Sequence, residues 1–258
     1  MKLNDKIVLI TGAASGIGKA TALKCAGYGA TIAAIDLRGD VLQATVEEIK
    51  ATGAKAAGFV ADVTDRASVQ KAVQAVIAEF GRIDCLFNNA GVCIPNLMLD
   101  VSDSEYDKTM DIDVKGAFIV ATEVAKEMIK RKKGRIVNTA SISAYRGEYG
   151  NMVYCMAKAA VRMMTKGQAI EWSPQGVTAV AISPGHINTD LLYGAFVGKA
   201  ESEGKKVEDY YAEMADTIAV GRLGEPEEIG ELVAFLFDER SYYMNGQSVL
   251  IDGGKVME

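Results

Sequence analysis

Tyr154 and Lys158 have residue types suited to proton transfer and stand four positions apart. On a helix this spacing places the phenol and the ammonium group on one face. A phenol with its reference pKa of about 10 is a poor base at neutral pH, and a nearby ammonium group favours the phenolate. Tyr154 could then take a proton from an alcohol or return one. The same spacing also arises by chance on surface helices, so its meaning depends on the rest of the chain.

Ser141 stands thirteen residues before Tyr154, just after an expected strand. Its hydroxyl group could hydrogen-bond a substrate oxygen while that oxygen gains or loses charge. Together with Tyr154 and Lys158 it would polarise a carbonyl group. This chemistry requires a hydride donor beside the three side chains.

A glycine-rich turn, TGAASGIG at residues 11–18, follows the first apolar run and precedes a helix expected to begin near Ile17. Glycines let the chain turn sharply and bring backbone N–H groups against a pyrophosphate at a helix N-terminus, where the dipole favours negative charge. Such a turn alone is weak evidence, and its spacing is GxxxGxG rather than GxGxxG. The expected strand and helix on either side predict a dinucleotide site at Gly12, Ser15, Gly16, Ile17 and Gly18.

Asp36 ends the second expected strand, 18 residues after Gly18. A carboxylate there could accept hydrogen bonds from both adenosine ribose hydroxyls and would repel a 2′-phosphate. Arg38 could in principle face a phosphate, but the glycine turn contains no basic residue. We therefore predict NAD rather than NADP. The alternative is that Asp36 only initiates a turn.

The elements that would position these groups alternate along the chain. Segments 69–80 and 229–237 show the apolar spacing of amphipathic helices, and a helix over 151–170 would carry Tyr154 and Lys158. This order predicts a single α/β domain over 1–258, a doubly wound Rossmann-type parallel sheet of seven strands with helices on both faces. The stretch 188–224 breaks the alternation, and we expect a lid over the ligand there. The expected strands are 6–10, 31–36, 56–61, 85–87, 135–138, 177–182 and 248–251.

Composition narrows the classes of function. The chain has 258 residues, of which 49% are hydrophobic, so a large core is feasible, and its net charge of −6 argues against a nucleic-acid partner. Four cysteines without CxxC pairing and one histidine predict reduced thiols and no metal site. The first apolar run ends after four residues, so we expect no signal peptide, no membrane association and a cytoplasmic protein.

In combination, these features resemble the short-chain dehydrogenase/reductase family over residues 2–254. The matching segments are TGAASGIG at 11–18, Asp36, DV at 62–63, NNAG at 88–91, Ser141, YCMAK at 154–158, SPGHINT at 183–189 and GQSVLIDGG at 246–254.

The resemblance implies an NAD-dependent oxidoreductase with Ser141, Tyr154 and Lys158 as catalytic residues. Tyr154 and Lys158 would also contact the cofactor. The resemblance further implies a homotetramer or a homodimer, with helices around 105–130 and 152–172 in one interface. The remaining cofactor contacts that it implies are Asp62, Val63, Asn89, Ala90, Gly91, Pro184, Gly185, Ile187 and Thr189.

The chain departs from the family pattern at Asp113, in DIDVKG, where the family usually has an Asn that helps to hold a water linked to the lysine. An ionised carboxylate accepts hydrogen bonds but cannot donate one as an amide does. Asp113 could still order the water, could retune Lys158, or could mark a weakened or altered enzyme.

The resemblance also locates a substrate pocket, and its hydroxyl, amide and carboxylate groups suit a polyol or a keto sugar better than a steroid. The alternative for Glu148 and Asn151 is that they are solvated loop residues that cap the next helix. His186 is expected to be a positioned loop side chain rather than a base. The expected pocket residues are Ser143, Tyr145, Glu148, Tyr149, Asn151, His186, Tyr193 and the lid segment 191–196.

Three other functions stay open. A 3-oxoacyl carrier protein reductase would prefer NADP and present a basic patch to its acidic carrier. A hydroxysteroid dehydrogenase is a second alternative. Asp113 also leaves room for a dinucleotide-sensing protein without catalysis, although Ser141, Tyr154 and Lys158 argue against it.

Overall fold

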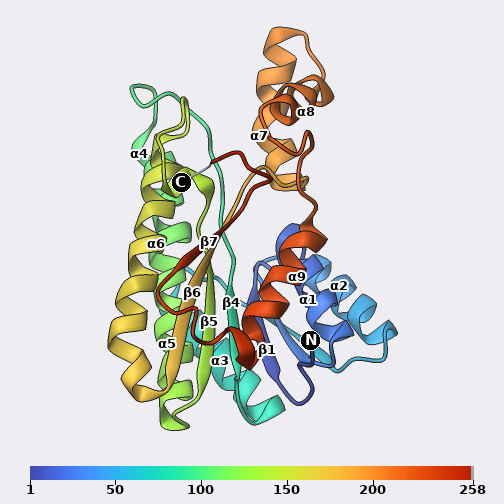
Figure 1. Ribbon diagram of the computed structural model, residues 1–258, viewed down its shortest axis with the longest axis vertical. Coiled ribbons are helices and arrows are strands. Elements are labelled where there is room, and N and C mark those ends of the chain that lie inside the picture. Colours follow the sequence, from blue (N-terminus) through green and yellow to red (C-terminus); the bar gives the residue numbers. More distant parts are fainter. Residues whose placement is uncertain (257–258) are drawn as a thin grey trace.

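A parallel sheet of seven strands forms the centre of the computed structural model, which describes residues 1–256 except for the side chains at 198, 199, 201 and 202 (Figure 1). The strand order is β3-β2-β1-β4-β5-β6-β7, and every neighbouring pair is parallel. The predicted strands are confirmed, and β6 ends two residues later than expected. The strands are β1 (Ile7–Thr11), β2 (Thr31–Asp36), β3 (Ala56–Val60), β4 (Cys85–Asn88), β5 (Gly134–Thr139), β6 (Val177–Pro184) and β7 (Ser248–Ile251).

Helices cover both faces of the sheet, as Figure 1 shows. One face carries α1 (Gly16–Gly27), α2 (Gly39–Ala51) and α9 (Pro226–Phe237). The other carries α3 (Arg66–Phe80), α5 (Ala117–Lys130) and α6 (Met152–Trp172). The predicted doubly wound α/β fold is therefore confirmed.

The core lies in two layers, one on each face of the sheet, because the inner strands are buried on both sides. In β1, for example, Val8 and Ile10 pack toward α1 and α9, whereas Leu9 packs toward α3 and α5. All five residues of β1 are buried. This accounts for the nearly continuous apolar runs in the sequence, which lack the alternation of a one-sided sheet.

Two short helical segments carry or adjoin residues identified in the sequence, Asp113 and Ser141. A single π-helical segment, η1 (Asp111–Gly116), joins α4 (Asp103–Met110) to α5. The 3₁₀ turn η2 (Ile142–Ala144) follows β5, and two further 3₁₀ turns, η3 (Ser173–Gln175) and η4 (Glu239–Ser241), follow α6 and α9. Wider π turns are frequent at functional sites.

The excursion after β6 folds as two helices, α7 (Asp190–Glu203) and α8 (Val207–Asp216), which stand at the carboxyl end of the sheet (Figure 1). They share a small apolar cluster, in which the Phe196 and Tyr210 rings stack with centroids 5.3 Å apart. Both ends of the excursion meet at Gly224, whose N–H donates to His186 O at 3.0 Å and whose carbonyl accepts from Asn188 N at 2.9 Å. The excursion is therefore a closed loop on the edge of the domain.

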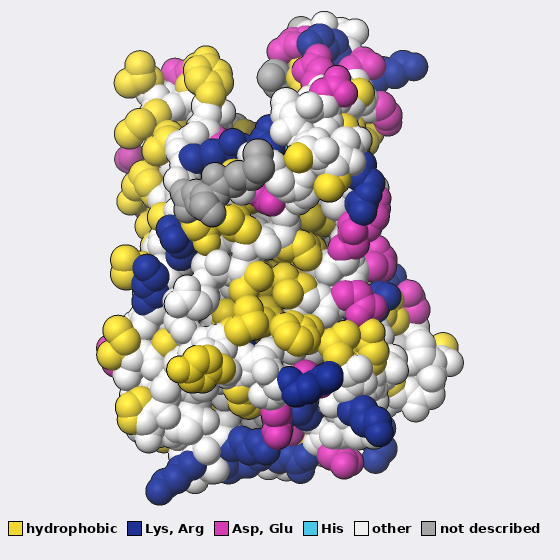
Figure 2. Space-filling model, in the orientation of Figure 1, with side chains coloured by type: hydrophobic (Ala, Val, Ile, Leu, Met, Phe, Trp, Pro, Cys, Tyr) yellow, Lys and Arg dark blue, Asp and Glu magenta, His cyan; other side chains and the backbone are white. Residues whose placement is uncertain are grey.

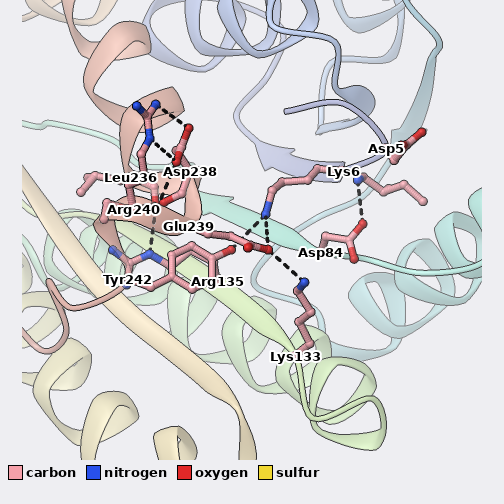
Figure 3. A network of polar contacts seen from close by, with 12 residues as sticks. Asp5, Lys6, Asp84, Lys133, Arg135, Leu236, Asp238, Glu239, Arg240 and Tyr242 are labelled. Atoms are coloured by element: carbon pink, nitrogen blue, oxygen red, sulfur yellow. Dashed lines mark hydrogen bonds and ion pairs between the residues drawn. The ribbon is translucent and has the colours of Figure 1, made fainter. Parts of the chain in front are cut away.

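At the end of the sheet opposite to α7 and α8, a polar network connects η4 to the starts of β1 and β5 (Figure 3). Lys6 and Lys133 both pair with Glu239, at 3.7 and 2.9 Å. Arg135, at the start of β5, is completely buried, and its Nε donates to Leu236 O at 2.9 Å. Its guanidinium group lies 5.2 Å from the centre of the Tyr242 ring, and burial lowers its pKa to about 10. Neither Nη atom has a hydrogen-bond partner among the described residues.

Within the described residues, no helix is both long enough and apolar enough to span a bilayer. The same part of the chain contains no cluster of three or more His, Cys, Asp or Glu side chains that could bind a metal ion.

Candidate active site

A cavity of about 530 Å³ opens at the carboxyl end of the sheet. It lies beside β1, where the strand order reverses because β2 pairs with one edge of β1 and β4 with the other. This reversal of strand order is the usual ligand site of a doubly wound sheet. The predicted residues that line the cavity are Gly12, Ser15, Gly16, Ile17, Asp36, Asp62, Val63, Asn89, Ala90, Gly91, Asp113, Tyr154, Lys158, Thr189 and Leu191.

The glycine turn fits a pyrophosphate group for reasons visible in its geometry. Gly12 and Gly16 have φ angles of 65° and 52°, which disfavour any residue with a Cβ atom. A Cβ on Gly18 would lie 2.1 Å from the Gly12 carbonyl oxygen, so Gly18 allows the turn to close although it does not line the cavity. Ser15 begins α1 without a side-chain cap, which leaves the first N–H groups of that helix available to an anion.

Asp36 lines the cavity, and its side chain is 7% exposed. One carboxylate oxygen accepts from Ala14 N at 3.1 Å, and the other accepts from the Arg38 backbone N at 3.0 Å and Nε at 3.2 Å. Arg38 Nη2 in turn donates to Ser15 Oγ at 2.9 Å. Asp36 therefore shapes its own turn and also lines the cavity, and its contact with a cofactor ribose stays a prediction.

Helix α6 brings Tyr154 and Lys158 together, as their spacing predicted. Lys158 Nζ lies 5.3 Å from the centre of the Tyr154 ring and donates to Thr139 O at 3.2 Å. Thr139 was not predicted from the sequence, because a backbone acceptor leaves no mark on residue type. Ser141 lies at the N-terminus of η2, where its Oγ accepts from Ser143 N at 3.1 Å.

The charges around Tyr154 oppose one another. Its pKa is raised to about 12: burial has the largest effect and raises it, the positive charge of Lys158 lowers it, the negative charge of Asp113 raises it, and a hydrogen bond with Ser141 lowers it. Burial lowers the pKa of Lys158, but the charges of Asp113 and Tyr154 and the hydrogen bond with Asp113 together outweigh that effect and raise it to about 12. Lys158 is therefore an ammonium group at neutral pH.

Asp113 makes a direct contact with Lys158. The η1 segment places it with a side chain that is 0% exposed, and its Oδ1 lies 2.7 Å from Lys158 Nζ. Its Oδ2 accepts from Val92 N at 2.9 Å. A Cβ on Gly91 would lie 2.7 Å from Asp113 Oδ1, so the glycine makes room for the pair. At this distance no water lies between the carboxylate and the ammonium group.

The expected substrate residues fall into two groups. Ser143, Glu148 and Asn151 lie together beside Ser141: Ser143 Oγ donates to Glu148 Oε2 at 2.9 Å, and Asn151 Nδ2 lies 3.4 Å from the same oxygen. Asn151 stands at the start of α6 without a side-chain cap, so it does not serve as the capping residue of the alternative interpretation. Cys93, which the sequence did not single out, lies 3.6 Å from Asn151 Oδ1.

The other group lies apart. The side chain of Tyr149 is 94% exposed, and Tyr145 hydrogen-bonds Ser248 O at 3.2 Å. His186 lines a separate cavity of about 130 Å³ together with Ile187. Tyr193, on α7, is 48% exposed, and Pro184 and Gly185 close the end of β6 without lining the larger cavity.

Comparison with known proteins agrees with this geometry. A family model described as enoyl-(acyl carrier protein) reductase matches residues 12–255. The 3-oxoacyl-[acyl-carrier-protein] reductase FabG of Thermotoga maritima is 37% identical over 258 residues, the full length of both chains. NAD⁺-bound xylitol dehydrogenase superimposes with a TM-score of 0.93 at 32% identity, covering 98% of this chain and 100% of the other. L-sorbose reductase from Gluconobacter frateurii, complexed with NADPH and L-sorbose, gives 0.94 at 28% identity, covering 100% and 98%. These matches over essentially the whole chain show that it is a member of the short-chain dehydrogenase/reductase family.

Proposed function

We propose that the protein uses NAD to interconvert a secondary alcohol and a ketone, with a polyol or a keto sugar as its substrate. The observation that carries the proposal is the position of Tyr154 and Lys158 in the same cavity as the glycine turn and Asp36. A cofactor held by the turn would bring its reactive ring toward the two side chains. When bound, NAD supplies or accepts the hydride.

The proton step belongs to residues of this chain. Tyr154 Oη takes the alcohol proton during oxidation and returns it during reduction. Lys158 favours the phenolate by its positive charge, and Ser141 hydrogen-bonds the same substrate oxygen. Gly12, Ser15, Gly16, Ile17, Asp62, Val63, Asn89, Ala90, Gly91 and Thr189 would hold the cofactor. Gly18, Pro184, Gly185 and Ile187 would act by shaping the backbone around it.

The preference for NAD rests on Asp36. Its carboxylate lines the cavity, and Arg38 is turned toward Ser15 and Asp36 itself. A 2′-phosphate there would meet a carboxylate before it met a free guanidinium group. The similar structures include one bound to NAD⁺ and one complexed with NADPH, so they favour neither cofactor. The proposed preference for NAD therefore depends on Asp36 and Arg38 of this chain.

The polyol assignment rests on Ser143, Glu148 and Asn151, which present hydroxyl, carboxylate and amide groups beside Ser141. A 3-oxoacyl carrier protein reductase is the second candidate, and the relative from Thermotoga maritima favours it. A net charge of −6 argues against docking of an acidic carrier.

We also propose a homo-oligomer that uses α4, α5 and α6. Apolar side chains are exposed on the outer surfaces of α5 and α6, among them Phe118, Met156, Met163 and Ile170, at 49%, 41%, 65% and 78%. Figure 2 shows hydrophobic side chains along the edge of the molecule that α6 forms. Large exposed apolar side chains gathered on one side of a protein often mark an interaction surface.

The test follows NADH absorbance with matched panels of polyols, keto sugars, steroids and acyl thioesters, using NAD and NADP in turn. We expect turnover of polyols with NAD. Tyr154→Phe removes the proton carrier while keeping the ring, so it should abolish turnover and leave NAD binding intact. Tight NAD binding without turnover of any compound would instead favour the dinucleotide sensor.

A further inference from the structure

Three side chains form a ladder of hydrogen bonds that leads away from the catalytic group: Ser141, Ser143 and Glu148. Ser141 Oγ donates to Ser143 Oγ at 3.1 Å, and Ser143 Oγ donates to Glu148 Oε2 at 2.9 Å. An ionised carboxylate can only accept, so Ser143 must donate to it. The oxygen of Ser143 is then left to accept from Ser141. Glu148 thus sets the direction of both hydrogen bonds.

This direction occupies the proton of Ser141. A hydroxyl group has a single proton, and Ser141 donates it to Ser143, while its oxygen also accepts from Ser143 N at 3.1 Å. In this arrangement Ser141 can accept a hydrogen bond from a substrate alcohol, but to donate to a substrate carbonyl, to an alkoxide or to the Tyr154 phenolate it must withdraw its proton from Ser143.

Glu148 is more accessible to solvent than the two serines. Its side chain is 20% exposed, whereas Ser141 and Ser143 are buried. Arg146 Nη2 lies 3.5 Å from Glu148 Oε1, and Asn151 Nδ2 lies 3.4 Å from Oε2, so the carboxylate is held from two sides. The titratable groups His186, Lys255, Cys93 and Cys155 also interact electrostatically with it.

Successive oxygens of the ladder are 3.1 and 2.9 Å apart, and a polyol likewise carries oxygens on neighbouring carbon atoms. A substrate whose reacting oxygen lies between Tyr154 and Ser141 would carry its adjacent hydroxyl group to Glu148. That hydroxyl can donate to the carboxylate in place of Ser143. Ser143 is then free to turn, and Ser141 can donate to the reacting oxygen.

We propose that Glu148 is a positioning residue which selects substrates with a hydroxyl group on the carbon next to the reacting carbon. On the alcohol side these are vicinal diols, and on the ketone side α-hydroxy ketones. The inference rests on the proposed function, because it requires Tyr154 and Ser141 to handle the reacting oxygen. It predicts that the adjacent hydroxyl group raises kcat as well as lowering KM.

The experiment compares oxidation of butane-2,3-diol and butan-2-ol at saturating NAD. For the unmodified protein we expect kcat for the diol to exceed that for the mono-alcohol by about tenfold, the contribution of one hydrogen bond to a charged group. Ser143→Ala releases the Ser141 proton for both substrates. The kcat preference should then fall to within about threefold, because the mono-alcohol reacts faster, while the diol keeps its lower KM through Glu148.

Two variants at position 148 separate hydrogen bonding from a general structural role. Glu148→Ala should remove the diol preference in both kcat and KM. Glu148→Gln keeps an oxygen that accepts from Ser143, so it should restore the kcat preference to within about threefold of the original. Matching melting temperatures and NAD affinities of all variants would exclude misfolding as the cause.

Equal kcat values for the two alcohols in the unmodified protein would overturn the inference, and so would a kcat preference that Ser143→Ala leaves unchanged. Either result leaves the proposed alcohol oxidation in place. If no alcohol or ketone is turned over with NAD or NADP, the proposed function fails, and the inference fails with it.

Discussion

Asp113 and Lys158 form a buried ion pair, with 2.7 Å between Oδ1 and Nζ, at the back of the cavity that also contains Tyr154. The pair partly neutralises the charge that should favour the Tyr154 phenolate. Because the pKa of Tyr154 is raised by burial and by Asp113, and lowered by Lys158, any change in the pair will alter proton transfer.

Asp113→Asn should retain or raise turnover at neutral pH. Removing the negative charge lowers the pKa of Tyr154, and a shift of one unit would give about a tenfold increase in kcat/KM for alcohol oxidation. The amide oxygen can still accept from Val92 N or from Lys158, but not from both as two carboxylate oxygens do. The measurement is kcat/KM against pH. A complete loss of activity would show that the carboxylate has become essential.

The same variant should be less stable. Lys158 stays buried and charged but loses its partner, which costs about 3 kcal/mol when a buried pair is broken from one side. Denaturant unfolding of both proteins measures this difference. Asp111→Asn is the matched control, because Asp111 pairs with Lys115 on the surface of the same segment, with side chains 49% and 56% exposed.

Oxidation of alcohol should accelerate with rising pH. Tyr154 must be a phenolate to accept the proton, and its pKa of about 12 means that the phenolate is a small fraction at neutral pH. We expect log kcat/KM to rise with a slope near one through the neutral and mildly alkaline range, and ketone reduction to show no such rise. Equal oxidation rates at acidic and alkaline pH would contradict the role of Tyr154.

Asp36→Ala should weaken the discrimination between the two cofactors. The change removes the carboxylate that would bind the ribose hydroxyls, and it frees the Arg38 side chain that now lies 3.2 Å from it. We expect KM for NAD to rise about tenfold, as the loss of a charged hydrogen bond implies, and NADP to become usable. Asp36→Ala combined with Arg38→Ala should lose the gain with NADP but keep the weaker binding of NAD.

Arg135→Met should maintain or raise stability. The guanidinium group is fully buried, has no carboxylate partner among the described residues and leaves both Nη atoms without hydrogen bonds. Leu236 O would keep a partner, because Ser241 Oγ also donates to it at 2.9 Å. We expect a gain of about 1 kcal/mol in the free energy of unfolding, as for other buried charges replaced by apolar groups. A loss of several kcal/mol would show that the contact with the Tyr242 ring is stronger than this argument allows.

The sequence carried most of the fold because its signals are local. The unbroken apolar runs indicated strands buried on both faces, and the four-residue spacing placed Tyr154 beside Lys158 once the helix formed. The position of Asp113, in contrast, does not follow from a local sequence signal. Its direct contact with Lys158 depends on the wider turn of η1 and on the space beside Gly91, neither of which residue type reveals.

The substrate side was harder to predict for the same reason. Ser143, in η2, donates a hydrogen bond to Glu148 five residues later, whereas Tyr149, one residue further along, points into solvent. Loop residues close in sequence can diverge in space, because no repeating backbone geometry sets their directions. His186 lies in a segment with fixed backbone contacts, because His186 O and Asn188 N are both hydrogen-bonded to Gly224. Its side chain lines the smaller cavity.

The pairing at Gly224 has an evolutionary meaning. Since residues on either side of the α7 and α8 excursion are hydrogen-bonded to each other at Gly224, the span between β6 and α9 stays the same whatever the excursion contains. Insertions or deletions beyond Leu191, the last residue of the excursion that lines the larger cavity, would therefore leave the sheet and the glycine turn in place. Changes in the α7 and α8 excursion could thus alter substrate specificity while Tyr154 and Lys158 keep their positions.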